Sequence, residues 1–262
     1  MVEPLTRESL IESFNSLGIR TGTRLVVHSS LRNLGPIDGG ADTVLDALIS
    51  CIGSEGLLVM PTFTYQNEGF NPDISPSKTG ILSELLRKRP DAVRSLHPTH
   101  SITAIGDGAV ALCEDHFLKP GLGINSPLDL VAKMGGGILL LGVGHTSNST
   151  VHVGEAYAKM SYLDIPFRPS YPISIPILGS VQMEVELLDP PGCSRAFGVI
   201  EALLRKRSAI QDGLIGKALV QWISGEEVIS ATTELLRMDD AALLCSDPTC
   251  YRCSKSRERL WR

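Results

Sequence analysis

The feature that most constrains the fold is an alternation of short apolar runs with amphipathic segments over the first 155 residues. Runs of strand length lie at 24–28, 57–60, 102–105 and 138–143. Segments with apolar side chains at helical spacing lie at 6–17, 43–51, 80–89, 109–116 and 128–134. Strands that alternate with helices are typical of a mainly parallel sheet covered by helices. The pattern therefore predicts an α/β protein, an α/β/α sandwich with a largely parallel central sheet.

The C-terminal part has a different texture. Residues 164–191 are proline-rich and contain β-prone runs at 173–175 and 181–188, which predict a β-rich extension. We expect a helix over 197–207, a final strand or helix pair at 214–221 and 228–238, and a polar, partly disordered tail over 239–262. A length of 262 residues suits a single domain with two lobes, 1–163 and 164–262.

Three helix starts carry recognisable signals. Thr6 is a candidate N-cap for the first helix, and Asp38 or Asp42 for the second. Ser126 and Pro127 have the order expected for an N-cap and the first helical position.

Composition excludes several classes of protein. The net charge of −5 is opposite to the basic surface that nucleic acid requires, so no nucleic-acid partner is expected. No run of 18 apolar residues is present, so no membrane span is expected. The N-terminal residues are acidic and amphipathic and lack the order of a signal peptide, which indicates the cytoplasm.

The six cysteines are expected to be free thiols in that compartment. Cys245, Cys250 and Cys253 are close in sequence and could begin a zinc site with a fourth ligand from elsewhere. No second CxxC pair completes such a site, so incidental thiols in a tail turn are the favoured interpretation and no metal is expected.

The stretch GVGHTSNSTVHVGE, residues 142–155, is the strongest candidate for chemistry. It follows an apolar run, and strand ends are where open α/β sheets place their sites. His152 and Glu155 are three positions apart, so on a helix they share one face. A carboxylate so placed orients an imidazole as a general base. The alternative is a helix start, capped by Ser149 or Thr150, with a surface His and Glu.

Two other polar clusters follow apolar runs or interrupt them. His28 and Ser29 end the first strand, and His97 and His100 flank Pro98, where a simple surface turn is the alternative. The chain lacks a P-loop, a complete dinucleotide fingerprint, a GxSxG elbow and an HExxH pair.

Four stretches together resemble one family. They are VHSSLRNLGPIDGGADTVLDAL from Val27, GLLVMPTFTY from Gly56, RSLHPTHSITAIGDGA from Arg94 and SPLDLVAKMGGGILLLGVGHTSNSTVHVGEAY from Ser126. In order and spacing they resemble the aminoglycoside 3-N-acetyltransferases, the antibiotic N-acetyltransferase family, whose fold is distinct from that of the GNAT enzymes. The resemblance implies transfer of acetyl from acetyl-CoA to an amine of an aminoglycoside.

The resemblance also implies residue roles. His152 matches the family's catalytic histidine and Glu155 the carboxylate that follows it, while Thr150 or a neighbouring N–H would stabilise the oxyanion. The lobe over 1–163 would bind CoA and carry catalysis, and the lobe over 164–262 would face the substrate. Expected CoA-binding residues are His28, Ser29, Ser30, Leu31, Arg32, Ser101 and Ser126. Expected substrate-side residues are Glu68, Asp73 and His97.

His100 and His145 receive no role. Expected partners are CoA and the amine, with the chain a monomer or a homodimer. Two alternatives stay open. One is an N-acyltransferase of a biosynthetic sugar or other amine, and the other is an inactive relative that binds CoA or sugar.

Overall fold

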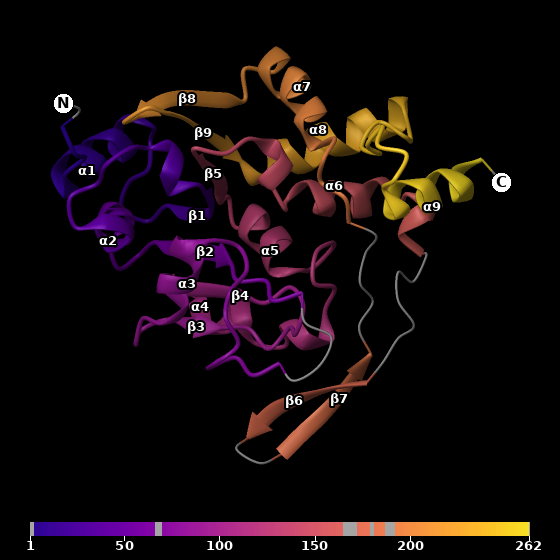
Figure 1. Cartoon of the computed structure of the whole chain (residues 1–262), viewed down its shortest axis with the longest axis horizontal. Helices are drawn as coiled ribbons and strands as arrows, with labels where there is room; N and C mark the ends of the chain where they lie inside the picture. The colour runs from indigo at the N-terminus through magenta and orange to yellow at the C-terminus, as the bar shows by residue number, and fades with distance from the viewer. Residues whose placement is uncertain (1–2, 66–69, 165–171, 179–180, 187–191, 262) are drawn as a thin grey trace.

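The computed structural model describes residues 3–65, 70–164, 172–178, 181–186 and 192–261, the segment 164–186 by its backbone alone. Seven strands form one sheet in the order β3-β4-β2-β1-β5-β9-β8 (Figure 1). They are β1 (Arg24–Ser29), β2 (Leu57–Pro61), β3 (Val93–Arg94), β4 (Ile102–Gly106), β5 (Gly137–Leu141), β8 (Ile210–Ile215) and β9 (Ala218–Ser224).

Only the centre of the sheet is parallel. Strand β1 runs parallel to both β2 and β5, whereas β4, β3, β9 and β8 join with antiparallel pairings. The predicted fold class is confirmed, with the parallel character confined to β2, β1 and β5. The carboxyl ends of these three strands therefore meet at one edge, as in other open α/β sheets.

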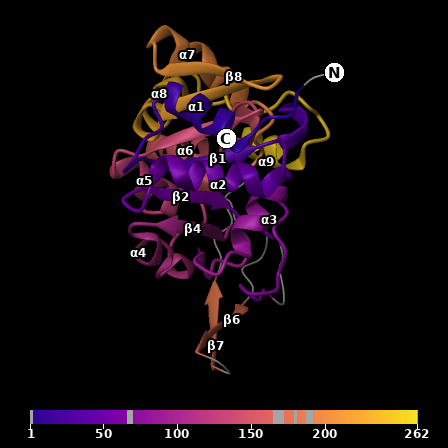
Figure 2. The same ribbon diagram turned by 90° about the vertical axis from the view of Figure 1, so that its left-hand side faces the viewer.

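Helices cover both faces of the sheet. One face carries α1 (Arg7–Ser16), α2 (Gly40–Ile52) and α3 (Ile81–Arg87). The other carries α4 (Ala109–Cys113), α5 (Pro127–Lys133), α6 (Val151–Ala158), α7 (Ile200–Lys206) and α8 (Gly225–Met238). In Figure 2, α1 and α2 lie in front of the strands. In Figure 1, α6 and α8 lie on the side of the sheet opposite to α1 and α2.

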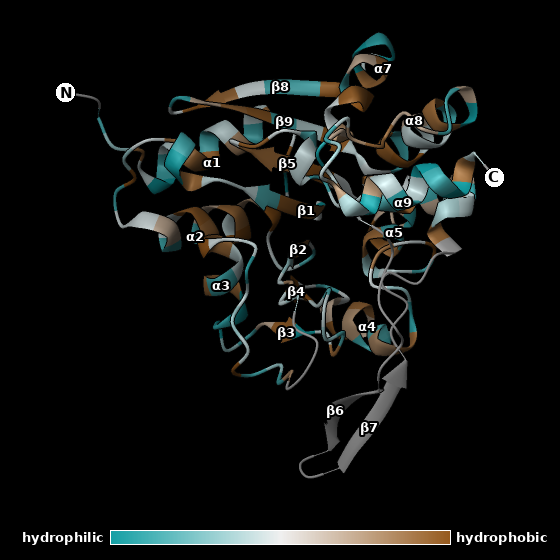
Figure 3. Ribbon diagram, turned by 45° about the vertical axis from the view of Figure 1, so that its right-hand side comes forward, coloured by the Kyte–Doolittle hydropathy of each residue, from teal (hydrophilic) through white to brown (hydrophobic). Residues whose placement is uncertain are grey.

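Alternation along the central strands explains the two cores. Leu25 and Val27 of β1 pack with the first set of helices, and Val26 packs with the second. Successive side chains of a strand point to opposite faces, so a strand buried on both faces must be apolar throughout. Figure 3 shows this as hydrophobic colour in the central strands and mixed colour on the helices.

Two of the three predicted helix starts are confirmed and one is wrong. Thr6 caps α1 in a capping box with Ser9, and Ser126 is the N-cap of α5, with Pro127 in its first turn. The prediction that Asp38 or Asp42 caps α2 is wrong. The N-cap is Gly39, which has the left-handed φ of 70° that glycine adopts without strain.

The C-terminal part completes the main sheet. The proline-rich region contains β6 (Pro172–Leu178) and β7 (Val181–Glu186), which pair antiparallel as a separate two-stranded sheet. After it, β8 and β9 extend the central sheet from β5, and α8 packs against α6. The segment from 192 onward therefore shares its core with the first half of the chain.

The prediction of a partly disordered tail is wrong. Residues 251–260 form α9 (Tyr251–Leu260), which buries Cys253 and Ser256 and packs on the 3-10 helix η4 (Ser161–Asp164). Arg257 Nη2 donates to the carbonyl of Leu244 at 3.1 Å, which ties the helix to the preceding loop. The polar composition conceals this helix because few of its side chains are buried. Within the described residues, no helix combines the length and apolarity needed to cross a bilayer.

Candidate active site

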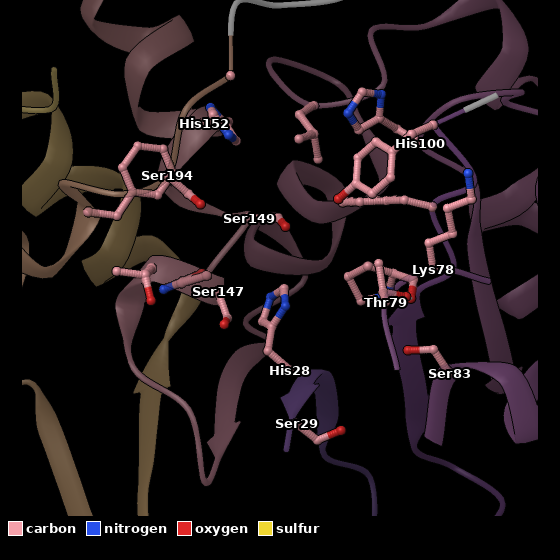
Figure 4. Close-up of a pocket in the computed structure, with 18 of the residues that line it drawn as sticks. His28, Ser29, Lys78, Thr79, Ser83, His100, Ser147, Ser149, His152 and Ser194 are labelled. Atoms are coloured by element: carbon pink, nitrogen blue, oxygen red, sulfur yellow. The ribbon is translucent and has the colours of Figure 1, made fainter. Parts of the chain in front are cut away.

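A cavity of about 310 Å³ opens at the carboxyl ends of β1, β2 and β5. Its lining combines histidines, hydroxyl groups and aromatic rings from segments far apart in the chain. Figure 4 shows His152, His28 and His100 on three sides of this space, with Lys78 on the side of His100. The site lies where the parallel centre of the sheet predicts it.

His152 and Glu155 form a hydrogen-bonded pair in the cavity wall. Both lie on α6, three residues apart, and His152 Nδ1 is 2.6 Å from Glu155 Oε2. The two side chains are only 10% and 5% exposed, so little water competes for the contact. Because an ionised carboxylate can only accept, Nδ1 carries the proton and Nε2 is left as the acceptor.

Tyr162 holds the other oxygen of the carboxylate. Its hydroxyl donates to Glu155 Oε1 at 3.1 Å, and the ring is fully buried in η4. Burial, followed by the charge of Glu155, raises the pKa of Tyr162, so the phenol stays protonated and remains a donor. Glu155 is thus fixed at both oxygens, and a fixed carboxylate fixes the imidazole plane.

Local sequence explains how α6 reaches the cavity. After β5 the chain turns at Gly142, which has a φ of 70°. The 3-10 helix η3 (His145–Ser147) follows, and Asn148 Oδ1 accepts the N–H of Thr150 at 3.1 Å. Val151 and Val153 then bury into the core. This anchoring leaves His152, between them, directed to the cavity.

Phe197 and Gly192, which follow β7 in the chain, lie against the imidazole of His152. Phe197 packs edge-on against His152, with ring centroids 4.7 Å apart. A Cβ added at Gly192 would lie 3.1 Å from His152 Nε2, so the backbone passes directly beside this nitrogen. Position 192 therefore leaves no room for a larger side chain without displacing the ring.

His28 presents an unsatisfied ring nitrogen. It is the penultimate residue of β1, is buried, and its Nε2 has no hydrogen-bond partner within the described residues. Burial, with a smaller effect of His145, lowers the pKa of His28 to about 3, so the ring is neutral at pH 7. A buried polar atom without a partner is costly, and a ligand group that pairs with it would remove that cost.

The opposite wall carries His100, Tyr65 and Phe63. The ring of His100 packs edge-on against Phe63 at 4.8 Å and against Tyr65 at 5.9 Å. Lys78 and Arg252 also line the cavity. Among the described lining residues no side chain is a carboxylate, so the wall is electropositive.

Of the residues that follow His28 in the expected CoA site, only Ser29 belongs to the described cavity lining. Ser29 lines the cavity, whereas Ser30 lines a neighbouring groove that shares Thr146 and Ser147 with it. Leu31 and Arg32 belong to the 3-10 helix η1 (Leu31–Asn33) and line neither space, Arg32 being exposed.

The buried hydroxyls serve the frame instead. Ser101 Oγ donates to the carbonyl of Thr62 at 2.7 Å, and Ser126 Oγ accepts the N–H of Gly123 at 3.2 Å. Thr150 is buried with its hydroxyl unpaired within the described residues and does not line the cavity.

The substrate-side candidates are dispersed. Asp73 is exposed in a loop outside the lining, and Glu68 lies outside the described residues. His97 is buried behind the wall, where its Nδ1 accepts the N–H of His100 at 3.1 Å and its ring packs on His116. It shapes the turn that presents His100.

Sequence reasoning missed several residues of the cavity wall. His100 had no role assigned, and Tyr65, Lys78, Phe197 and Arg252 were not singled out as site residues, yet all line the cavity. The dense cluster around Pro98 was the signal for His100. The others carry no local signal because they come from a loop, a short 3-10 helix and the C-terminal helix. Together, the fold and the buried His–Glu pair in the cavity wall are typical of an α/β enzyme.

Comparison with known proteins identifies the family. A model of the aminoglycoside 3-N-acetyltransferases matches residues 26–237, and the chain belongs to this family. Aminoglycoside N(3)-acetyltransferase IV from a Salmonella species is 30% identical over 242 residues, which cover 91% of this chain and 90% of that one. The protein is therefore an N-acetyltransferase with acetyl-CoA as its cosubstrate.

Solved structures agree with the fold. The apoenzyme of aminoglycoside acetyltransferase AAC(3)-IVa superposes with a TM-score of 0.86 at 28% identity and covers 99% of both chains. A variant of AAC(3)-IVa in which one histidine is replaced by alanine, in complex with a gentamicin, gives a TM-score of 0.86 at 27% identity over 99% of both chains.

Proposed function

We propose that this enzyme transfers the acetyl group of acetyl-CoA to the 3-amino group of a 2-deoxystreptamine aminoglycoside, with His152 as general base. The observation that carries the proposal is the buried pair of His152 Nδ1 and Glu155 Oε2, 2.6 Å apart beside the cavity. The gentamicin complex of a structurally similar enzyme supports the choice of acceptor.

His152 supplies what an amine acceptor needs. A protonated amine has no lone pair for attack, so a neighbouring base must take a proton from it. Nε2 of His152 takes that proton, and the imidazolium that results is stabilised by the Glu155 carboxylate at Nδ1. As the C–N bond forms, the attacking nitrogen loses a second proton to solvent. When the C–S bond breaks, His152 can return the proton it holds to the sulfur of CoA.

The turn before α6 offers a donor for the oxyanion. The N–H of Asn148 donates to the carbonyl of His145, and that of Thr150 to Asn148 Oδ1. Within the described residues this leaves the N–H of Ser149, a cavity residue next to the positive end of α6. We assign it the role that the sequence suggested for Thr150 or a neighbouring N–H.

The electropositive wall suits acetyl-CoA, which supplies the thioester when bound. Lys78 and Arg252 are placed to offset phosphate charge, and His28 Nε2 with Ser29 to bind polar groups of the pantetheine arm. This keeps the expected role of His28 and Ser29 and adds the two cations.

A polycationic acceptor needs carboxylates that the described lining does not contain. We propose that Glu68 contributes one, because it belongs to the segment that follows Tyr65, a cavity residue. The charge of the described wall also suits a less cationic amine, so a biosynthetic amino sugar is the second candidate. We further propose that the enzyme acts in the cytoplasm as a monomer or homodimer.

The test is thiol release from acetyl-CoA against gentamicin-like aminoglycosides and simple amino sugars. Turnover of the antibiotics, with kcat/KM lowered about 10²–10⁴-fold by His152→Ala, is the expected result. Glu68→Gln should raise the KM for the aminoglycoside, and Lys78→Met the KM for acetyl-CoA alone. If turnover is confined to simple amino sugars, the proposed acceptor is a biosynthetic amino sugar and not an aminoglycoside antibiotic. A His152→Ala variant of near-normal activity would reject the general base.

A further inference from the structure

We propose that Cys193, Cys245, Cys250 and Cys253 bind one zinc ion in a tetrahedral site of four sulfur ligands. Their sulfur atoms all lie within 4.8 Å of one another, although Cys193 and Cys245 are 52 residues apart in the chain. All four are free thiols. The sequence alone favoured incidental thiols here, because no second CxxC pair follows or precedes the three cysteines of the tail.

The spacing fits a single ion better than a disulfide. The sulfurs of Cys193 and Cys245 are 3.7 Å apart, far from the ~2.05 Å of a disulfide bond. A zinc ion with Zn–S bonds of about 2.3 Å separates its sulfurs by about 3.8 Å in a regular tetrahedron. Four thiols gathered at this scale surround a space that one ion fills.

Backbone groups already point at the sulfurs. The N–H of Cys245 donates to Cys253 Sγ at 3.3 Å, and N–H groups of Cys253 and Arg195 are directed at the sulfurs of Cys250 and Cys193. Amide donors of this kind orient thiolate ligands and offset their charge. Cys250 is the N-cap of α9, where the helix dipole also favours negative charge.

The remaining cysteines provide a contrast. Cys51 and Cys113 are buried in separate parts of the core, and each donates its thiol to a backbone carbonyl, of Ile11 and Val93 respectively. Burial alone therefore does not bring cysteines together in this fold.

The ion would brace one side of the active site. Cys193 lies between Gly192 and Ser194, both in the cavity wall, and Arg252, between two ligands, donates to the carbonyl of Gly192 at 2.5 Å. Gly192 in turn lies beside His152 Nε2. The helix that carries Cys253 packs on η4, whose Tyr162 holds Glu155. The proposed zinc site does not depend on the proposed function. The effect of zinc on turnover, however, rests on that function.

The direct test is the metal content of the full-length protein, purified under reducing conditions without chelators. We expect one zinc per chain by elemental mass spectrometry, and less than about one fifth of that in Cys253→Ser. Cys113→Ser, a matched change of a buried cysteine outside the cluster, should keep the full content. Wild-type protein without metal, or with a Cys193–Cys245 disulfide, would overturn the proposal.

Cobalt keeps the test independent of how the variants fold. Wild-type protein stripped of zinc and given Co²⁺ should show the intense thiolate-to-cobalt absorption of tetrahedral sulfur sites, and zinc should abolish it. Absence of that absorption in refolded, thiol-reduced protein also overturns the site. If the proposed function holds, zinc removal should lower kcat/KM by up to about 10²-fold through displacement of Gly192, and added zinc should restore it. If the protein binds the metal but does not turn over the substrates, the proposed function is rejected and the proposed zinc site is retained.

Discussion

The replacement Glu155→Gln tests the proposed catalytic role of the His152–Glu155 pair most sharply, because it changes the charge with almost no change in volume. In the wild-type protein, Glu155 Oε2 accepts from His152 Nδ1 at 2.6 Å, and the side chains are 10% or less exposed. A glutamine that donates its amide N–H to Nδ1 would move the imidazole proton to Nε2. The nitrogen that should accept the amine proton would then be a donor.

The magnitude follows from the charge that is lost. When His152 is protonated, its positive charge lies about 4 Å from the carboxylate, which at an effective dielectric constant of about 20 corresponds to about 4 kcal/mol. At about 1.4 kcal/mol for each factor of ten, the loss in kcat/KM is at most about 10³-fold. Partial compensation by water reduces it, so we expect about 10²–10³-fold.

The assay is steady-state thiol release, with thermal unfolding measured in parallel. Glu227→Gln, a change of a half-buried carboxylate on α8 that pairs with Arg207, serves as the control and should keep full activity. The double variant with His152→Ala should be no slower than His152→Ala alone, because the two residues act as a unit. A folded Glu155→Gln enzyme within threefold of wild type would refute the pair, as would additive losses in the double variant.

Two further predictions concern stability. Gly154→Ala places a Cβ 2.4 Å from Thr232 Cβ, so α6 must move away from α8. We expect the free energy of unfolding, measured with urea, to fall by about 1–3 kcal/mol. Gly198→Ala, where the added Cβ has no atom within 4 Å, should lose little, and equal losses in the two variants would contradict the packing argument. Burial lowers the pKa values of His28 and His116 to about 3, so between pH 6.5 and 3 the unfolded chain binds more protons than the folded one and stability falls as pH falls. From pH 7 to pH 5 the two rings together should cost about 4 kcal/mol. Burial also lowers the pKa of His97, which adds to the loss, so His116→Gln should remove about 2 kcal/mol of it. Unchanged stability at pH 5 would show that the rings are not neutral in the fold.

Much of the frame could be predicted because it is written locally. The apolar run 138–143 contains most of β5, and the segments at 43–51 and 128–134 lie within or overlap α2 and α5. Local signals failed where two patterns compete. The carboxylates near α2 suggested a cap, but Gly39 reaches a left-handed conformation at lower cost and the helix starts there.

The enzyme class and acetyl-CoA as cosubstrate were also predictable, through the resemblance of the four stretches, and the comparisons confirm both. The roles of individual site residues stay predictions. Glu68 lies outside the described residues, and Asp73 has no place in the described cavity wall. Acceptor recognition is thus the part of the site for which the sequence held the weakest signal.

By itself, the sequence determined the layered α/β fold and the pairing of His152 with Glu155. Periodicity selects strands and helices, and a spacing of three on a helix brings two side chains together wherever that helix lies. Tertiary structure alone decided what surrounds the pair. Tyr162 reaches Glu155 from η4, Gly192 passes beside the imidazole, and Cys193 meets three cysteines from more than 50 residues away. Such contacts depend on how distant segments pack, and no local pattern encodes that distance.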